Sequence, residues 1–267
     1  ILEDKPYVDI ILGPDSYRNI PKIIENRSES IDHLVDTKLS KFEMYDELFP
    51  SRNEGVNSWV SIMRGCNKFC TFCIVPFTRG RERSRPIESI VREIEKGVEE
   101  GFVEFTLLGQ NVNSYRTPNG RFPELLDAVA SIEGVKRLRF SSPHPRDVDD
   151  GMLEVMAAHD NICNHVHLPL QAGNDRILKR MNRTYTKEEF LNLADKIREY
   201  MPGCSLTTDV IVGFPGETEE EFLDTLDVIN RVGFNFAFMF KYSSRPGTKA
   251  AEFTNQIEED VKQNRWN

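Results

Sequence analysis

Six short runs of β-branched and aromatic residues recur along the chain, and amphipathic segments with helical spacing lie between successive runs. This alternation predicts a parallel sheet, because parallel neighbours need a long crossover connection. Eight such units close a standard barrel, so six units predict an open, partial (β/α)6 barrel of the α/β class, whose mouth can admit a large substrate. The predicted strands are 59–63, 102–108, 136–141, 164–168, 205–212 and 235–242.

Helix-end signals support this number of units. Proline is favoured near the first turn and glycine just past the last, while threonine followed three residues later by glutamate forms a capping box. These signals occur at Pro86, Gly101, Thr186 with Glu189, and Thr218 with Glu221. Ahead of the barrel, residues 7–12 predict a strand and 16–25 a helix. The polar stretch 26–57 is expected to be a linker with little structure of its own.

Three cysteines, Cys66, Cys70 and Cys73, follow the first predicted strand within eight residues. Three thiolates without a fourth nearby leave one iron of a four-iron cluster open for chemistry. Structural zinc requires four ligands, and neither Cys163 nor Cys204 forms a second pair, so both are interpreted as small buried hydrophobic residues. Five cysteines is an odd number, which disfavours a disulfide scaffold. Zinc, or three unrelated thiols, remain the alternatives.

The triad and its surroundings resemble a known family. The C-x3-C-x2-C spacing, with Phe72 before the last cysteine, is similar to the signature of the radical S-adenosylmethionine (AdoMet) superfamily. Residues 64–67 and 73–81 resemble its methylthiotransferases, and 107–113 are similar to the tRNA-modifying MiaB branch. The resemblance runs from about residue 59 to 249. It implies a barrel of the radical AdoMet type and a 4Fe-4S cluster on the three cysteines, with AdoMet chelating the fourth iron.

The same resemblance implies a reaction and partners. Reductive cleavage of AdoMet would give a 5′-deoxyadenosyl radical that abstracts hydrogen from carbon 2 of isopentenyladenosine beside the anticodon, and a methylated sulfur would replace it. Threonylcarbamoyl-adenosine tRNA or a ribosomal-protein aspartate are alternative substrates, and a non-catalytic binding module is a competing class. The expected partners are a tRNA anticodon stem-loop and an electron donor such as flavodoxin or ferredoxin. No membrane is expected, and the location would be cytoplasmic.

The family architecture implies four segments. Residues 1–40 would be the remnant of an N-terminal methylthiotransferase domain belonging to the α/β class, 41–57 a linker, 58–252 the radical AdoMet core, and 253–267 the start of a connection to a missing C-terminal RNA-binding domain. The family also has a second, auxiliary 4Fe-4S cluster. It is expected in the full-length protein, but residues 1–57 contain no cysteine to ligate it.

Polar and glycine-containing motifs follow the predicted carboxyl ends of the strands, where β/α barrels place their active sites. By resemblance, amides of the second loop would hold the methionine end of AdoMet, serines the ribose, glycines would admit the adenine, and an arginine would pair with the carboxylate. Ordinary turn formation and a helix-end cation are the alternatives. The predicted AdoMet residues are Phe72, Gln110, Asn111, Asn113, Ser141, Ser142, Gln171, Arg183, Gly213 and Phe214.

The net charge of −9 argues against binding a polyanion unless basic residues are concentrated. Arg79, Arg81, Arg83 and Arg85 are such a concentration, and the first three are predicted to contact RNA. The alternative is a solvated loop that pairs with nearby glutamates. His165 and His167 share one strand face, but they lack a third ligand and are predicted to orient their neighbours rather than bind a metal.

Overall fold

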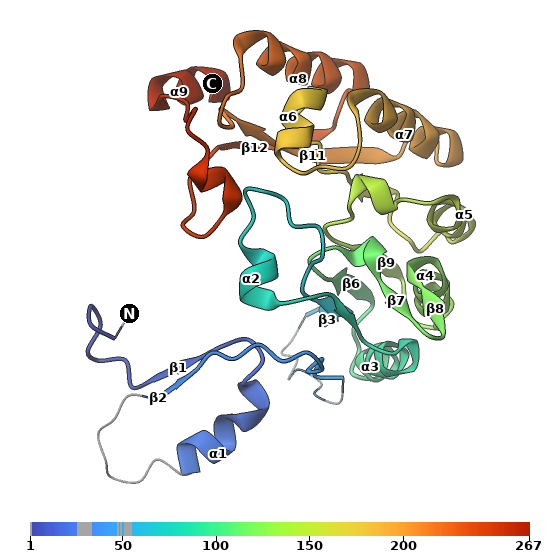
Figure 1. The fold of residues 1–267 in the computed structure, drawn as a ribbon. Coiled ribbons are helices and arrows are strands. Elements are labelled where there is room, and N and C mark those ends of the chain that lie inside the picture. Colours follow the sequence, from blue (N-terminus) through green and yellow to red (C-terminus); the bar gives the residue numbers. More distant parts are fainter. Residues whose placement is uncertain (1, 26–33, 47, 49, 51–54) are drawn as a thin grey trace.

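The computed structural model describes residues 2–25, 34–46, 48, 50 and 55–267. Six parallel strands follow one another in chain order as two three-stranded sheets, β3-β6-β9 and β10-β11-β12 (Figure 1). Their bounds are β3 (Asn57–Ser61), β6 (Glu104–Leu108), β9 (Arg137–Phe140), β10 (His165–His167), β11 (Ser205–Val212) and β12 (Phe236–Lys241). All six predicted strands are therefore confirmed, and they form an open barrel.

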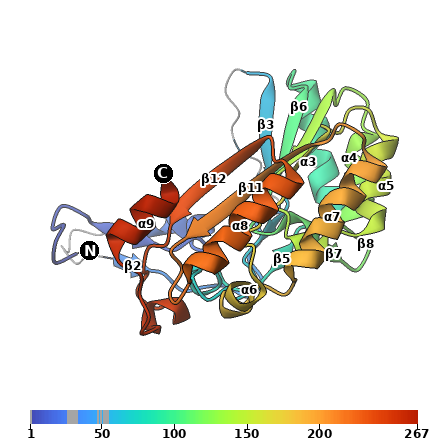
Figure 2. The same ribbon diagram turned by 90° about the horizontal axis from the view of Figure 1, so that it is seen from above.

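The helices pack on the outer side of this arc of strands (Figures 1 and 2). On β11, side chains alternate strictly between buried and half-buried, as expected for a strand with one face against helices. The capping boxes at Thr186 and Thr218 are both formed, and Pro86 is the residue before its helix. The helices between and after the strands are α3 (Ile87–Glu99), α4 (Phe122–Ala130), α5 (Asp150–Ala158), α6 (Asp175–Arg180), α7 (Lys187–Tyr200), α8 (Glu219–Val232) and α9 (Glu259–Trp266).

Several short elements in the loops were not predicted. Ladders of two residues are too short to show an alternating pattern, so the sequence gives no signal for them. They are the antiparallel pairs β4 (Met63–Arg64) with β5 (Arg83–Ser84) and β7 (Arg116–Thr117) with β8 (Gly120–Arg121). The short helices are α2 (Val75–Arg79), η2 (Val112–Ser114), η3 (Pro145–Asp147) and η4 (Lys249–Glu252). A further one, η1 (Tyr17–Asn19), lies within the predicted helix 16–25.

The N-terminal segment contains β1 (Ile10–Leu12), α1 (Ile20–Glu25) and β2 (Leu34–Asp36), and β1 pairs in parallel with β2. The predicted strand and helix are confirmed. The expectation of a linker with little structure of its own over 26–57 is wrong for β2 and for Asn57, which begins β3, whereas residues 37–46 form no helix or strand. This stretch still contacts the barrel, because the Ser89 hydroxyl donates to the Asp46 carbonyl at 2.6 Å. Residues 26–33, 47, 49 and 51–54 of that stretch lie outside the described residues.

The two three-stranded sheets meet along a narrow seam. The Leu138 amide donates to the Asn161 carbonyl at 2.8 Å, and the Cys163 amide donates to the Leu138 carbonyl at 2.9 Å. We call residues 65–82 the Cys loop. It leaves the first sheet but binds the C-terminal end of α6, which connects two strands of the second sheet. The Thr71 amide donates to the Met181 carbonyl at 3.0 Å, and the Asn182 side chain donates to the Phe69 carbonyl at 2.9 Å. The Cys loop therefore contacts both halves of the barrel.

Among the residues that the structure describes, no helix has both the length and the apolar character needed to cross a membrane.

Candidate functional site

All five predicted motifs lie directly after the carboxyl ends of parallel strands. The Cys loop follows β3 and β4, and the other loops follow β6, β9, β10 and β11. Carboxyl ends of parallel strands meet at one edge of the sheet, which is the position of active sites in β/α barrels. Side-chain contacts join the loops after β3, β6 and β9 directly. Arg183 connects the loop after β10 to the Cys loop, and Arg180 of α6 connects the loop after β11 to it.

The base of the Cys loop is closed by the β4–β5 pair, in which Arg64 and Arg83 stand directly opposite each other. Like charges at opposed positions repel. Asp15 of the N-terminal segment compensates, because one carboxylate oxygen lies 3.3 Å from Arg64 Nη1 and 3.2 Å from Arg83 Nη2. All three side chains are largely buried. Asp15 therefore holds both ends of the loop.

The three thiols of the triad are free and partly buried. Burial is the main cause that raises the pKa of Cys66 to about 11; the Lys68 amide acts against it, and the charges of Glu82, Cys70 and Cys73 act in the same direction as burial. Burial also raises the pKa of Cys73. The thiols are thus close enough for their charges to interact, and they need a positive partner to ionise together.

Within the described ranges, no three His, Cys, Asp or Glu side chains converge closely enough to hold a single metal ion. A four-iron cluster is larger than one ion and is surrounded by its thiolates, with iron charge to balance them. The partly exposed triad, whose thiols repel one another when ionised, fits such a group.

The loop after β6 supports the Cys loop rather than presenting all its amides to solvent. Gln110 Oε1 accepts from the Gly65 amide at 2.6 Å. Asn113 is buried and exchanges two hydrogen bonds with the backbone of His144, at 2.7 and 3.0 Å. Asn111 is also buried, but its Oδ1 has no hydrogen-bond partner among the described residues. A buried unpaired acceptor marks a place where a donor is missing, so Asn111 is the most suitable ligand-binding amide of the three.

The loop after β9 reaches back to the Cys loop. Lys68 forms an ion pair with Asp147 at 2.5 Å, and Asp147 also accepts from Asn111 at 2.9 Å and Ser114 at 2.6 Å. Burial, together with the neighbouring Arg183 and Lys68, lowers the pKa of His144 to about 3. His144 is therefore a neutral imidazole near neutral pH. Neither Lys68 nor Asp147 was predicted, since ion pairs between distant loops leave no local signal.

The remaining predicted AdoMet residues fall into two groups. Ser142 is exposed with a φ of +54°, Ser141 is half-buried, and Phe72 is half-buried against the core. Gln171 is buried, with a φ of +66°. Its amide donates to the Asp209 carbonyl at 2.8 Å, and its carbonyl accepts from the Ile211 amide at 2.9 Å, both on β11. These placements leave the serines accessible at the strand ends, whereas Gln171 shapes the backbone of its loop.

The loop after β11 is held by a buried ion pair. Gly213, with a φ of +70°, donates its amide to Glu217 at 2.8 Å, and Glu217 pairs with Arg265 at 2.8 Å. Phe214 is fully buried and packs edge-on against Tyr242 and Phe253. Its side chain therefore supports the loop from the core, and no part of the residue is exposed to a ligand in this structure.

Glu217 gives the stability a specific pH dependence. Burial raises its pKa from 4.5 to about 7, although the Gly213 amide and Arg265 partly offset this. The folded protein thus binds this proton more tightly than the unfolded chain, so the stabilisation is complete below about 4.5 and is lost as pH rises through about 7. We expect a loss of roughly 3 kcal/mol across that window from this group.

Urea unfolding at several pH values measures this effect. Glu217→Gln should flatten the dependence, whereas Glu219→Gln should not, because Glu219 also pairs with Arg265 but is exposed. A Glu217→Gln variant that loses stability with pH as steeply as the unmodified chain would contradict the assignment.

The four arginines of the basic cluster differ in burial: two are exposed and two are buried. Arg79 and Arg81 are exposed, and the Arg81 guanidinium lies over the Phe69 ring at 4.6 Å. Arg83 is buried and paired with Asp15, and Arg85 is buried and paired with Glu93 at 2.6 Å. The prediction that Arg83 contacts RNA is therefore wrong for this conformation, because its guanidinium faces the interior. The alternative of a solvated loop also fails for these two arginines.

The histidines of β10 orient their neighbours, as predicted. His165 and His167 share the Thr207 hydroxyl at 3.0 Å each, and His167 lies 3.2 Å from Asp209. Cys204 is buried, as predicted, whereas Cys163 is only half-buried, so the prediction of a buried residue is confirmed for Cys204 alone.

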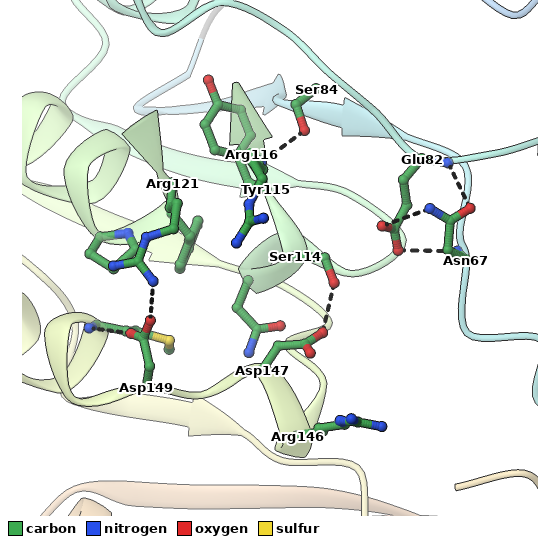
Figure 3. Close-up of a pocket in the computed structure, with 14 residues that line it drawn as sticks. Asn67, Glu82, Ser84, Ser114, Tyr115, Arg116, Arg121, Arg146, Asp147 and Asp149 are labelled. Carbon is green, nitrogen blue, oxygen red and sulfur yellow. Dashed lines mark hydrogen bonds and ion pairs between the residues drawn. The ribbon is translucent and has the colours of Figure 1, made fainter. Parts of the chain in front are cut away.

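A cavity of about 570 Å³ lies beside the Cys loop, between β5, the β7–β8 hairpin and the first turn of α5 (Figure 3). Its acids are already paired: Glu82 with Asn67, Asp147 with Lys68, and Asp149 with Arg121. Arg116 points into the cavity and Arg146 lies at its edge, and both are exposed. The cavity thus has cationic groups available beside the loop.

Comparison with known proteins gives consistent results. The profile of the radical SAM superfamily matches residues 60–229. The chain is 49% identical to the tRNA-2-methylthio-N(6)-dimethylallyladenosine synthase of Carboxydothermus hydrogenoformans, over 99% of the chain and 61% of that relative. It is also 49% identical to the enzyme of that name from Porphyromonas gingivalis, over 96% of the chain and 56% of the relative. The chain therefore spans less than two thirds of these relatives.

Two solved structures share the fold. The radical S-adenosylmethionine methyltransferase TsrM from Kitasatospora setae, with cobalamin and a 4Fe-4S cluster bound, is 19% identical with a TM-score of 0.61, over 72% of this chain and 38% of that one. Coproporphyrinogen III oxidase from Escherichia coli is 18% identical with a TM-score of 0.56, over 78% of this chain and 50% of that one. At such low identity, these similarities establish the fold alone.

Proposed function

Because this chain belongs to the radical SAM superfamily, we propose that it is the cofactor-binding core of a methylthiotransferase acting on tRNA. The observation that carries the proposal is the partly buried triad of thiols, at the strand ends of an open barrel, in a chain 49% identical to enzymes named for this activity. The substrate would be adenosine that carries an isopentenyl group, modified at carbon 2.

Cys66, Cys70 and Cys73 would hold the 4Fe-4S cluster, and the buried Asn111 Oδ1 would accept from the AdoMet amino group. When bound, the cluster and AdoMet supply one-electron reductive cleavage of the sulfonium, which yields a 5′-deoxyadenosyl radical. The protein positions these groups: Gln110 fixes Gly65 at the start of the Cys loop, and the Lys68–Asp147 pair joins that loop to η3. An electron donor such as flavodoxin or ferredoxin would provide the reductant in the cytoplasm.

The open edge of the barrel suits a large substrate. Bases in an anticodon loop are unpaired and can be turned outward, so an adenine can enter a mouth that a duplex cannot. Phosphate contacts would come from the exposed Arg79 and Arg81, together with Arg116 and Arg146 at the cavity beside the Cys loop. Residues 58–252 would form the catalytic core, and 1–40 would belong to a preceding domain.

Neutralising Arg79 and Arg81 together in the full-length enzyme should weaken tRNA binding several-fold. Each lost phosphate contact should lower the slope of log affinity against log salt by about 0.7–0.9, and AdoMet cleavage should be unchanged. Filter binding at several salt concentrations measures this. Arg92→Gln, an exposed arginine on α3, is the matched control. An unchanged salt slope in the double variant would remove these residues from the RNA contact.

Substrate choice is tested by competition. The full-length enzyme is given isopentenylated tRNA, threonylcarbamoylated tRNA and ribosomal protein in parallel, and methylthio products are quantified by mass spectrometry. We expect product from the isopentenylated tRNA alone, because a site shaped for an apolar chain discriminates against a carboxylate. Equal or greater product from either alternative would assign the chain to another methylthiotransferase branch.

A further inference from the structure

Arg183 is a buried cation without a carboxylate partner. Its side chain lies beneath the strand ends with 9% of its surface exposed. Nε donates to the Tyr185 hydroxyl at 3.0 Å and Nη2 to the Pro169 carbonyl at 3.1 Å. Both acceptors are neutral, and no carboxylate among the described residues forms an ion pair with it. A buried guanidinium without a counter-charge is costly, so its surroundings should supply one.

The remaining donor points at the cysteine triad. Arg183 Nη1 lies 3.5 Å from Cys70 Sγ, within hydrogen-bonding distance for sulfur. A cysteine that ligates iron is a thiolate, so Cys70 provides the missing negative charge once the cluster is bound. The contact then becomes a charge-assisted hydrogen bond.

The position of the guanidinium is fixed by its neighbours rather than by a ligand. The Tyr185 hydroxyl donates toward the Pro169 and Leu170 carbonyls, at 3.0 and 2.8 Å. The Tyr185 ring packs against His144 at a centroid distance of 5.9 Å. Because Tyr185 and Pro169 hold two of the three guanidinium nitrogens, the third is aimed at Cys70 before AdoMet arrives.

We propose, on the basis of the proposed function, that Arg183 tunes the reduction potential of the cluster through the Cys70 thiolate. Reduction adds negative charge to the cluster, and a fixed cation that donates to a ligating sulfur stabilises the more negative state. Arg183 thereby raises the potential and makes the cluster easier to reduce. This role differs from pairing with the AdoMet carboxylate, because it operates in the absence of AdoMet.

The test is a redox titration of this chain followed by electron paramagnetic resonance, without AdoMet. The chain has one cysteine triad, so one cluster signal is followed. Arg183→Gln should lower the midpoint potential by at least 59 mV, which for one electron corresponds to a tenfold change in the reduction equilibrium. Arg180→Gln is the matched control, since Arg180 lies three residues away, stacks on Phe253 at 4.6 Å and donates to the Pro215 carbonyl.

A loaded Arg183→Gln cluster with an unchanged midpoint would overturn the proposal, as would a shift that appears only after AdoMet is added. If the Arg183→Gln variant does not retain iron, the proposal is tested instead on the unmodified chain by a second measurement. Pulsed resonance on protein labelled with 15N-arginine should show nitrogen coupled to the reduced cluster, and the coupling should persist in Arg180→Gln. Absence of that coupling would also overturn it. Failure of the unmodified chain to bind iron would instead contradict the proposed function.

Discussion

Alanine in place of any one of Cys66, Cys70 and Cys73 is expected to remove the brown colour of anaerobically reconstituted protein. The loop supplies three thiols without a fourth cysteine nearby, so the loss of one leaves two protein ligands for a cluster that needs three beside AdoMet. Bound iron should fall from roughly four atoms per chain to background. Reductive cleavage of AdoMet should disappear with it.

Iron analysis, visible absorption and chromatographic detection of 5′-deoxyadenosine measure these losses. Cys163→Ala is the matched control, because Cys163 is a half-buried free cysteine on the β9–β10 seam and belongs to no triad. It should retain both colour and cleavage. Retention of a cluster by the triple-alanine variant would refute the assignment of the site.

Asp15→Ala is expected to have the largest effect on stability. The substitution leaves Arg64 and Arg83 buried and opposite each other at the base of the Cys loop without the carboxylate that compensates them. Removing one partner of a buried ion pair costs about 3–5 kcal/mol. It also removes the acceptor of the Ser40 amide, at 2.8 Å, so the N-terminal segment should separate from the barrel.

Chemical unfolding and limited proteolysis of the N-terminal segment check this prediction. Asp127→Ala is the control, since Asp127 pairs with His159 at an exposed site and should cost at most about 1 kcal/mol. If Asp15→Ala were no more destabilising than Asp127→Ala, the burial of the Asp15 site would have to be wrong.

The sequence predicted what depends on local periodicity and motif position. The run of β-branched residues over 205–212 and the capping boxes at Thr186 and Thr218 depend on neighbours in the chain, and the structure confirms the strand and both boxes. The direction of Arg83 could not be predicted this way. A run of arginines is usually solvated, and its burial here depends on Asp15, a residue 68 positions earlier in the chain.

For the site residues too, local patterns were predictable from the sequence and contacts between distant residues were not. Asparagines after a strand suggest ligand binding, but two facing backbone groups of His144 determine that Asn113 is structural. The Lys68–Asp147 pair and the packing of Tyr185 against His144 join segments that are far apart in sequence. Only the spacing of the three cysteines within a single loop indicated the proposed cluster site before the fold was known.

The attachment of the Cys loop to both halves of the barrel couples the loading of the site to the stability of the fold. The bonds that Thr71 and Asn182 make add to the continuous hydrophobic core and to the packing of α5 on α7, which already join the two halves. A group that binds only the folded loop stabilises the folded state by mass action. A cluster held by the triad would therefore raise the free energy of unfolding of the whole barrel and not that of the loop alone.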